Sequence, residues 1–291
     1  MANMTVTTAA KHIGEVWPRA VLRAQEFNLE IAPRVYRDWK FAGYGDVYHV
    51  PRIPNIETQT KSASTDWTPS AYTDTEQTVT IDTHQVSGFL IEDITKTLSN
   101  TNMEMEMRQK IGYSLGRALE VNLATLPQSF SQVIGTLGEE LDYNDYVEAW
   151  EYLARAGIKL NPSDCTWVVS VGAASAMLKQ EIFISQLYQG DNPRAVEAAK
   201  IGKLLNAPVI VSNLTRAPAA GQSESFLMYK KSMALIQAKN ADMVVEYQAL
   251  KLGTVVGGQS IYGYAEVDRY SETPGNVTAT DEWAVLLRTV A

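Results

Sequence analysis

The chain has little of the chemistry that most enzyme classes require. Its 291 residues include one cysteine, Cys165, and three histidines, His12, His49 and His84. A single cysteine excludes an intrachain disulfide framework. No cysteine or histidine pair has the spacing of a zinc site. We therefore expect no metal and no cofactor.

A catalytic nucleophile is also missing from the pattern. Cys165 leads directly into the apolar run from Thr166 to Val171, where a small buried side chain is the commoner role. All histidines lie in the first 84 residues, so none is near the cysteine along the chain. Gly257, Gly258 and Gly263 fit no nucleotide-binding motif and suit bends or bulges in β structure. The carboxylates show no distinctive pair, and we name no catalytic residue.

The chain also lacks long hydrophobic runs and an excess of positive over negative charge. No run approaches the ~20 apolar residues that span a bilayer. The first residues do not resemble a secretory signal, so we expect folding in the cytoplasm without a membrane. The net charge is −8, from 25 basic and 33 acidic residues, which opposes a primary nucleic-acid binder. Hydrophobic residues make up 45% of the chain, enough for a proper core.

The most informative segment runs from Asp46 to Asp93. Alternating residues at 47–53 and 77–83 predict two strands around a polar, Ser/Thr-rich tip. This predicts a long β-arm that leaves the body of the subunit, with His49 and His84 facing each other across it. An isolated two-stranded ribbon is only marginally stable in water, so we expect a partner outside the subunit to hold the arm.

Helical signals follow the arm. A short helix is predicted over 92–99, and apolar residues at helical spacing predict a long helix over 103–126, stopped by Pro127. Asp145 and Glu148 have the spacing of a capping-box variant, which predicts a further helix ending at Gly157.

The rest of the chain predicts a mixed α+β domain and a β-rich tail. The expected elements, in order, are a strand at 166–171, a helix at 173–183, a strand at 208–212, three short strands at 226–230, 234–239 and 243–247, and more β structure from residue 254 onward.

In this order the parts resemble the major capsid protein of tailed bacteriophages, the Hong-Kong-phage shell fold. Residues 80–82 and 91–93 resemble the exit from that family's extended loop. Residues 201–212 resemble its helix-turn-strand element, with Asn206 where a glycine is common. Residues 260–264 resemble its late strand. The resemblance covers nearly the whole chain.

The resemblance implies an α+β fold with five parts. These are an N-terminal arm over 1–45, an extended β-hairpin loop over 46–90, a peripheral domain with a long spine helix over 91–140, an axial domain over 141–253, and return strands of the peripheral domain over 254–291.

The resemblance also implies a structural protein of the virion, not an enzyme. Copies would form hexamers and pentamers of an icosahedral capsid, assembled in the host cytoplasm and enclosing double-stranded DNA without sequence-specific binding. The implied partners are a portal, a separate scaffolding protein and, in some relatives, a decoration protein. Contacts between subunits are expected at Lys61, Asp66, Trp67, Tyr72 and Glu76 of the loop and at Trp17, Arg19 and Arg23 of the N-terminal arm.

Two alternatives stay open. An encapsulin-type nanocompartment has the same fold but holds enzyme cargo in place of a genome. A soluble α+β enzyme with an unrecognised carboxylate site belongs to another class, and a persistent active monomer would favour it.

Overall fold

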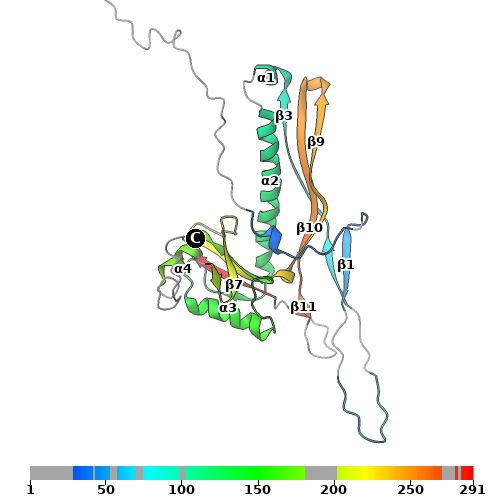
Figure 1. The fold of residues 1–291 in the computed structure, drawn as a ribbon, viewed down its shortest axis with the longest axis vertical. Helices are drawn as coiled ribbons and strands as arrows, with labels where there is room; N and C mark the ends of the chain where they lie inside the picture. The colour runs from blue at the N-terminus through cyan, green and yellow to red at the C-terminus, as the bar shows by residue number, and fades with distance from the viewer. Residues whose placement is uncertain are drawn as a thin grey trace, which may run out of the picture.

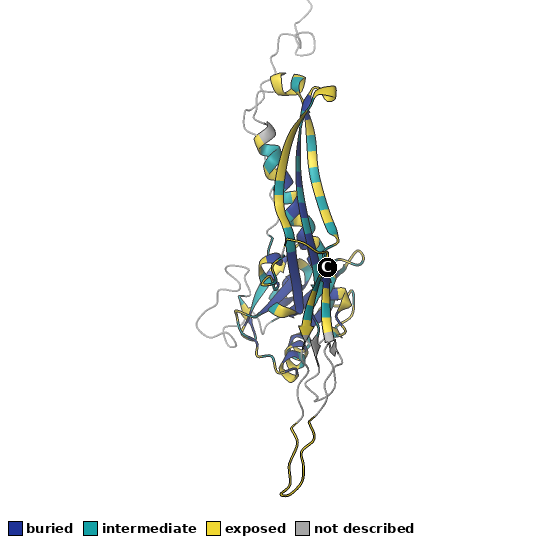
Figure 2. Cartoon of the chain, turned by 90° about the vertical axis from the view of Figure 1, so that its right-hand side faces the viewer, coloured by how far each residue is buried: buried dark blue, intermediate teal, exposed yellow. Residues whose placement is uncertain are grey.

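A computed structural model describes residues 29–41, 43–52, 58–69, 75–98, 103–180, 202–270, 279–280 and 283–290. The molecule is elongated, with a body built on a six-stranded sheet (Figure 1). A three-stranded sheet with its helix extends from the body in one direction, and a two-stranded β-arm extends in the other (Figure 2). The predicted mixed α+β fold is confirmed.

The body sheet has the strand order β4-β13-β8-β5-β7-β6. Its strands are β4 (Val133–Ile134), β5 (Cys165–Ser170), β6 (Lys203–Leu204), β7 (Ala207–Ser212), β8 (Gln222–Tyr229) and β13 (Ala284–Val290). Strand β5 is buried at every position because both faces of the sheet are covered. Helices α3 (Tyr143–Arg155) and α4 (Val171–Lys179) cover one face, and the end of the long helix covers the other.

The core of the body is centred on Trp167 of β5. Its ring meets Tyr146 of α3 edge to face at a centroid distance of 5.7 Å, and its Nε1 donates to the Leu204 carbonyl at 3.0 Å. A buried indole N–H needs such an acceptor. Cys165 packs in the same cluster, as predicted for a buried hydrophobe.

The three-stranded sheet, which we call the long sheet, has the order β3-β10-β9 and is antiparallel. It comprises β3 (Thr83–Glu92), β9 (Met233–Gln248) and β10 (Gly253–Glu266), and η5 (Ala249–Lys251) makes the far turn. We predicted two short strands within 234–247, but β9 is one strand of 16 residues. The polar stretch at Asn240 is not a turn, because β9 continues there out of the body along β10.

The predicted long helix is confirmed as α2 (Met103–Thr125), preceded by α1 (Asp93–Leu98) and followed by the 3-10 turn η3 (Leu126–Ser129) around the buried Pro127. It packs on one face of the long sheet, with Ile111 and Leu115 against Val256. Gly258 permits this approach, because an added Cβ would lie 2.4 Å from the Ile111 Cγ2.

The arm is an antiparallel hairpin of β1 (Val47–Arg52) and β2 (Thr75–Thr80). It is shorter than the predicted 46–90 loop, because β3 pairs with β10 and not with the hairpin. The expected His49–His84 pairing is therefore wrong. His49 lies opposite Thr78 in the arm, whereas His84 lies in the long sheet and contacts Gln259 at 3.2 Å.

Two further boundaries differ from prediction. The outer half of β9 belongs to the long sheet, and the final strand β13 belongs to the body sheet and not to the long sheet. Helix α3 starts at Tyr143, because Asp142 is its N-cap and Asp145 occupies the N3 position of the capping box. It ends at Arg155, two residues before the predicted end at Gly157, which has φ of 79°. Elements η4 (Lys230–Ser232), β11 (Arg269–Tyr270) and β12 (Ala279–Thr280) complete the described structure.

Candidate assembly surfaces

The base of the arm is attached to its own subunit by a small hydrophobic core. Val79 of β2 is fully buried against Ala234 and Ile236 of β9. The Gln77 side chain donates from Nε2 to the Glu266 carbonyl at 2.6 Å. The expectation that only a partner outside the subunit holds the arm is therefore corrected at its base, which packs as part of the folded subunit.

An N-terminal segment reinforces the base within the same cluster. The backbone of Tyr36 exchanges hydrogen bonds with β9, donating to the Met233 carbonyl and accepting from the Leu235 N–H, both at 2.9 Å. Trp39 then stacks on Tyr48 of β1, with ring centroids 5.9 Å apart and planes at 24°. Both β9 and the chain that precedes the arm therefore pack on one face of the arm base.

The tip of the arm, residues 58–69, is exposed at every position. It turns at Ser62–Thr65, where the Thr65 hydroxyl donates to the Ser62 carbonyl at 2.9 Å and Ser64 has φ of 65°. Lys61 and Asp66 flank the turn, and Trp67 is 59% exposed. Unlike the base, the tip has no buried residue.

The predicted contact residues divide into three groups. Lys61, Asp66 and Trp67 lie together on the exposed tip. Glu76 lies at the base in β2, opposite Pro51, where its carboxylate is 3.1 Å from the His49 Nδ1. Tyr72, Trp17, Arg19 and Arg23 lie outside the described residues.

The start of the described chain is anchored on α2 by a buried carboxylate. Glu120 is 1% exposed and accepts the backbone N–H of Ile31 at 2.9 Å and that of Ala32 at 2.9 Å. These residues begin the 3-10 turn η2 (Ala32–Arg34). Burial raises the pKa of Glu120 above its ordinary value, although the two N–H donors oppose that shift. Leu29 reaches the same helix at Gly116, where an added Cβ would lie 2.6 Å from its Cδ1.

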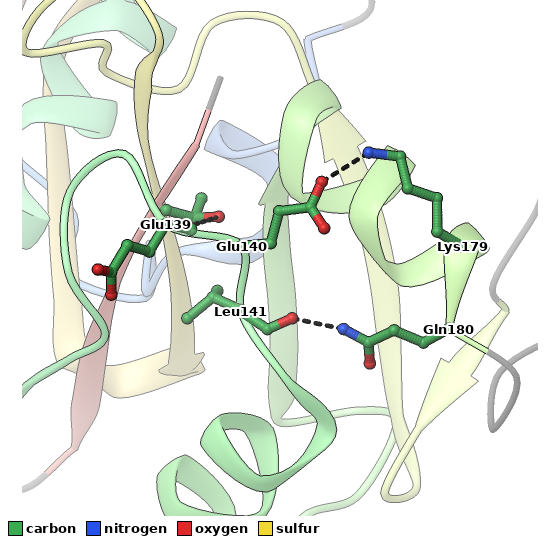
Figure 3. Close-up of polar contacts among 6 residues, drawn as sticks. Glu139, Glu140, Leu141, Lys179 and Gln180 are labelled. Atoms are coloured by element: carbon green, nitrogen blue, oxygen red, sulfur yellow. Dashed lines mark hydrogen bonds and ion pairs between the residues drawn. The ribbon is translucent and has the colours of Figure 1, made fainter.

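A second polar cluster joins α4 to the segment before α3 (Figure 3). Lys179 reaches the Glu140 carboxylate at 2.6 Å, and the Gln180 side chain donates to the Leu141 carbonyl at 2.6 Å. The Lys179–Glu140 pair is more than half exposed on both sides, so it contributes little to stability. The cluster orients the end of α4 and has no reactive arrangement.

Within the described ranges no group of three or more His, Cys, Asp or Glu side chains is placed to hold a metal ion. Burial raises the pKa of the Cys165 thiol, which keeps it protonated and unreactive. None of the described helices combines the length and the apolar character needed to cross a membrane.

Comparison with solved structures shows which fold this is. A structure from Mycobacterium phage Che8 matches with a TM-score of 0.77 at 17% identity, over 94% of this chain and 96% of that one. The capsid of Cyanophage P-SCSP1u matches at 0.78 and 15% identity, over 99% and 96%. The acid-stable capsid of Helicobacter pylori bacteriophage KHP30 matches at 0.77 and 11%, over 100% and 99%.

The chain has the fold of tailed-phage capsid proteins. No protein-family model and no curated protein sequence matches it. At such low identity, the three-dimensional arrangement is what this chain shares with those capsid structures.

Within this capsid fold, the sequence reasoning missed the Glu120 anchor. The only local signal is a carboxylate beside the apolar stripe of α2, next to Leu119 and three residues before Leu123. Its hydrogen-bond donors lie 88 and 89 residues earlier in the chain, so no local pattern points to them.

Proposed function

We propose that the protein is the major capsid protein of a tailed bacteriophage. Copies assemble as hexamers and pentamers into an icosahedral shell that encloses double-stranded DNA. The supporting observation is the match to phage capsid structures over almost the full length of both chains. A match of that extent includes the protruding arm and long sheet as well as the body.

The shape of the subunit favours this function over a soluble monomer. The tip of the arm is fully exposed and is carried away from the body, although its base is well packed. A protruding ribbon gains stability when a neighbour covers it. We propose that Lys61, Asp66 and Trp67 make such contacts, and that Tyr72, Glu76 and the N-terminal Trp17, Arg19 and Arg23 contribute further ones.

The remaining parts of the proposal follow from the same fold. The peripheral domain comprises α2 and the long sheet, and the axial domain comprises the body sheet. A portal and a separate scaffolding protein act in assembly in the host cytoplasm, and a decoration protein is an optional addition. The net charge of −8 suits a container for DNA, because an acidic protein does not bind phosphate non-specifically. The protein acts as a structural component and not as an enzyme.

The test is replacement of the tip, residues 58–69, by a glycine- and serine-rich segment of equal length. The arm base keeps its contacts, so we expect a monomer with an unchanged circular dichroism spectrum and no shells in electron micrographs. The unmodified chain, co-expressed with a candidate scaffolding protein, is the control and is expected to give closed shells. Shells of normal size from the replaced chain would contradict the proposed role of the tip.

The contents of the particles separate the two shell functions. Particles purified from infected cells are expected to hold long double-stranded DNA, detected by nuclease-protected nucleic acid. Particles filled with one enzyme and no genome would identify an encapsulin-type nanocompartment.

A further inference from the structure

Residues 29–41, which we call the strap, connect α2 to the base of the arm. Figure 1 shows the strap in dark blue, running from the side of α2 towards β1. Ile31 and Val35 are buried in a hydrophobic cluster with the end of α2. Trp39 packs against a different cluster, which contains Val79 of the arm. The strap therefore joins two separate hydrophobic clusters of the subunit.

The strap passes from one face of β9 to the other. Met233 and Leu235 of β9 belong to the cluster with α2, whereas Ala234 and Ile236 belong to the cluster with the arm. Neighbouring side chains along a strand point to opposite faces, so the two clusters lie on opposite faces of β9. Tyr36 marks the crossing, because its backbone pairs with β9 at the strand edge.

Each end of the strap has a specific anchor. At the α2 end, the buried Glu120 carboxylate accepts two backbone N–H groups of the strap, both at 2.9 Å. At the arm end, Trp39 stacks on Tyr48 of β1, and its ring also meets that of Tyr36 edge to face at a centroid distance of 5.1 Å. A buried N–H without an acceptor is costly, so loss of the Glu120 carboxylate should release the α2 end.

The arm is joined to the rest of the subunit by two short links. One is residues 43–46, which are exposed throughout, and Gly43 has φ of 92° with no described atom within 4 Å of an added Cβ. The other is residues 81–82, between β2 and β3. The Ile81 N–H donates to the Asp46 carbonyl at 2.7 Å, so the two links meet. Short links of this kind absorb the change of direction between two rigid parts.

We propose that the strap couples α2 to the arm, so that its attachment at Glu120 fixes the direction in which the arm points. With the strap attached, Trp39 holds Tyr48 and limits the swing of the arm about the two links. With the strap released, the arm base keeps the contacts of Val79 and Gln77, and the arm samples a wider range of directions while the body stays folded. The coupling lies within one subunit, so it goes beyond the proposed shell function and does not depend on it.

Distances between spin labels on the unassembled full-length chain test the direction of the arm. Thr68→Cys carries a label on the exposed tip, and Ala154→Cys carries one on the exposed side of α3, so this pair reports the arm relative to the body. Ala154→Cys with Val211→Cys is the matched control within the body, because Val211 is 44% exposed on β7. The native Cys165 is fully buried and stays unlabelled.

Two single variants cut the strap at its two ends. Glu120→Ala should widen the distribution of arm–body distances about twofold and leave the distribution within the body unchanged. Trp39→Ala should widen the arm–body distribution to a similar extent. The double variant should widen it no further, because both changes act through the same strap. Glu151→Ala, which removes an exposed ion pair with Arg155, should change neither distribution.

Hydrogen exchange reports the attachment of the strap itself. The amides of Tyr36 and Leu235, which pair the strap with β9, should exchange about tenfold faster in Glu120→Ala. Faster exchange with an unchanged arm–body distribution would overturn the coupling. Unchanged exchange and unchanged distances would overturn it as well, because the strap would then need no anchor at Glu120.

The double variant and the second end of the strap complete the test. Widening in the double variant that equals the sum of the two single effects would show that Glu120 and Trp39 act independently, which also overturns the coupling. If Glu120→Ala does not fold, Trp39→Ala carries the test, and an unchanged arm–body distribution in that variant would refute the proposal. A chain that forms no shells would contradict the proposed function and leave this inference intact.

Discussion

Removal of the Glu120 carboxylate is the sharpest test of how the N-terminal segment is attached to the subunit. Glu120→Ala deletes the acceptor for the Ile31 and Ala32 N–H groups, which lie in buried backbone. An unpaired buried N–H costs about 1–3 kcal/mol, so two such groups give a loss of about 2–6 kcal/mol. The variant also removes a carboxylate that is costly to bury, so we expect a result in the lower half of that range.

The assay combines urea unfolding with hydrogen exchange. The midpoint of unfolding should fall, and the amides of Ile31 and Ala32 should lose protection even where the body sheet keeps its own. Glu120→Gln keeps one acceptor oxygen within reach of both N–H groups and should lose less. Glu151→Ala is the control, because it removes only an exposed ion pair with Arg155 and should change stability by less than about 0.5 kcal/mol.

A Glu120→Ala chain that is as stable as the unmodified chain, with the Ile31 and Ala32 amides still protected from exchange, would refute this account. It would mean that Leu29 and the other apolar contacts hold the segment without the carboxylate. Equal losses for the Glu120→Ala and Glu151→Ala variants would point to a general effect of charge removal on helices.

Two other predictions concern pH and packing. The raised pKa of Glu120 means that the folded chain binds this proton more tightly than the unfolded chain, so its contribution is greatest in acid and is lost as pH rises through the raised value. The urea midpoint of the unmodified chain minus that of Glu120→Gln should therefore decrease as the pH rises from 4. An increase in this difference would contradict a raised pKa at Glu120. Gly258→Val forces a side chain against Ile111 and should cost about 1–3 kcal/mol in thermal unfolding. Gly257→Val places its side chain in open space and should lower the stability much less. Equal losses of stability for the two variants would show that the cost at Gly258 does not come from close packing against α2.

Sequence reasoning was most successful where a pattern is local. The spacing of Ile111 and Leu115 reflects one buried helix face, and the predicted α2 agrees with the structure to within one residue. The alternating runs around the Ser/Thr-rich tip likewise predicted the β1–β2 hairpin, whose partners are close in the chain. Asn206, at a position where the resembling family commonly has a glycine, has the left-handed conformation that glycine favours, with φ of 71°.

The errors arose where distant segments decide the structure. Alternation in β3 indicates a strand but does not name its partner, and pairing with β10 joins residues such as Thr83 and Tyr262 that are far apart in the chain. The continuity of β9 through Asn240 likewise depends on β10 running beside it. The pairing of Gly88 with Gly257 could not be predicted for the same reason, because these residues become neighbours only through this register.

The strands β9 and β10 run from the buried body to the far turn, so a rotation near the body would move the turn by a distance set by their length. The pairing of β10 with β9 shifts register between Gln259 and Tyr262, where the two strands leave the body. The seven residues of β10 beyond that point extend about 20 Å, so a rotation of about 10° would displace the far turn by about 4 Å. At that turn Leu250 is fully exposed. A small rotation at the register shift would therefore become a larger displacement at the far turn.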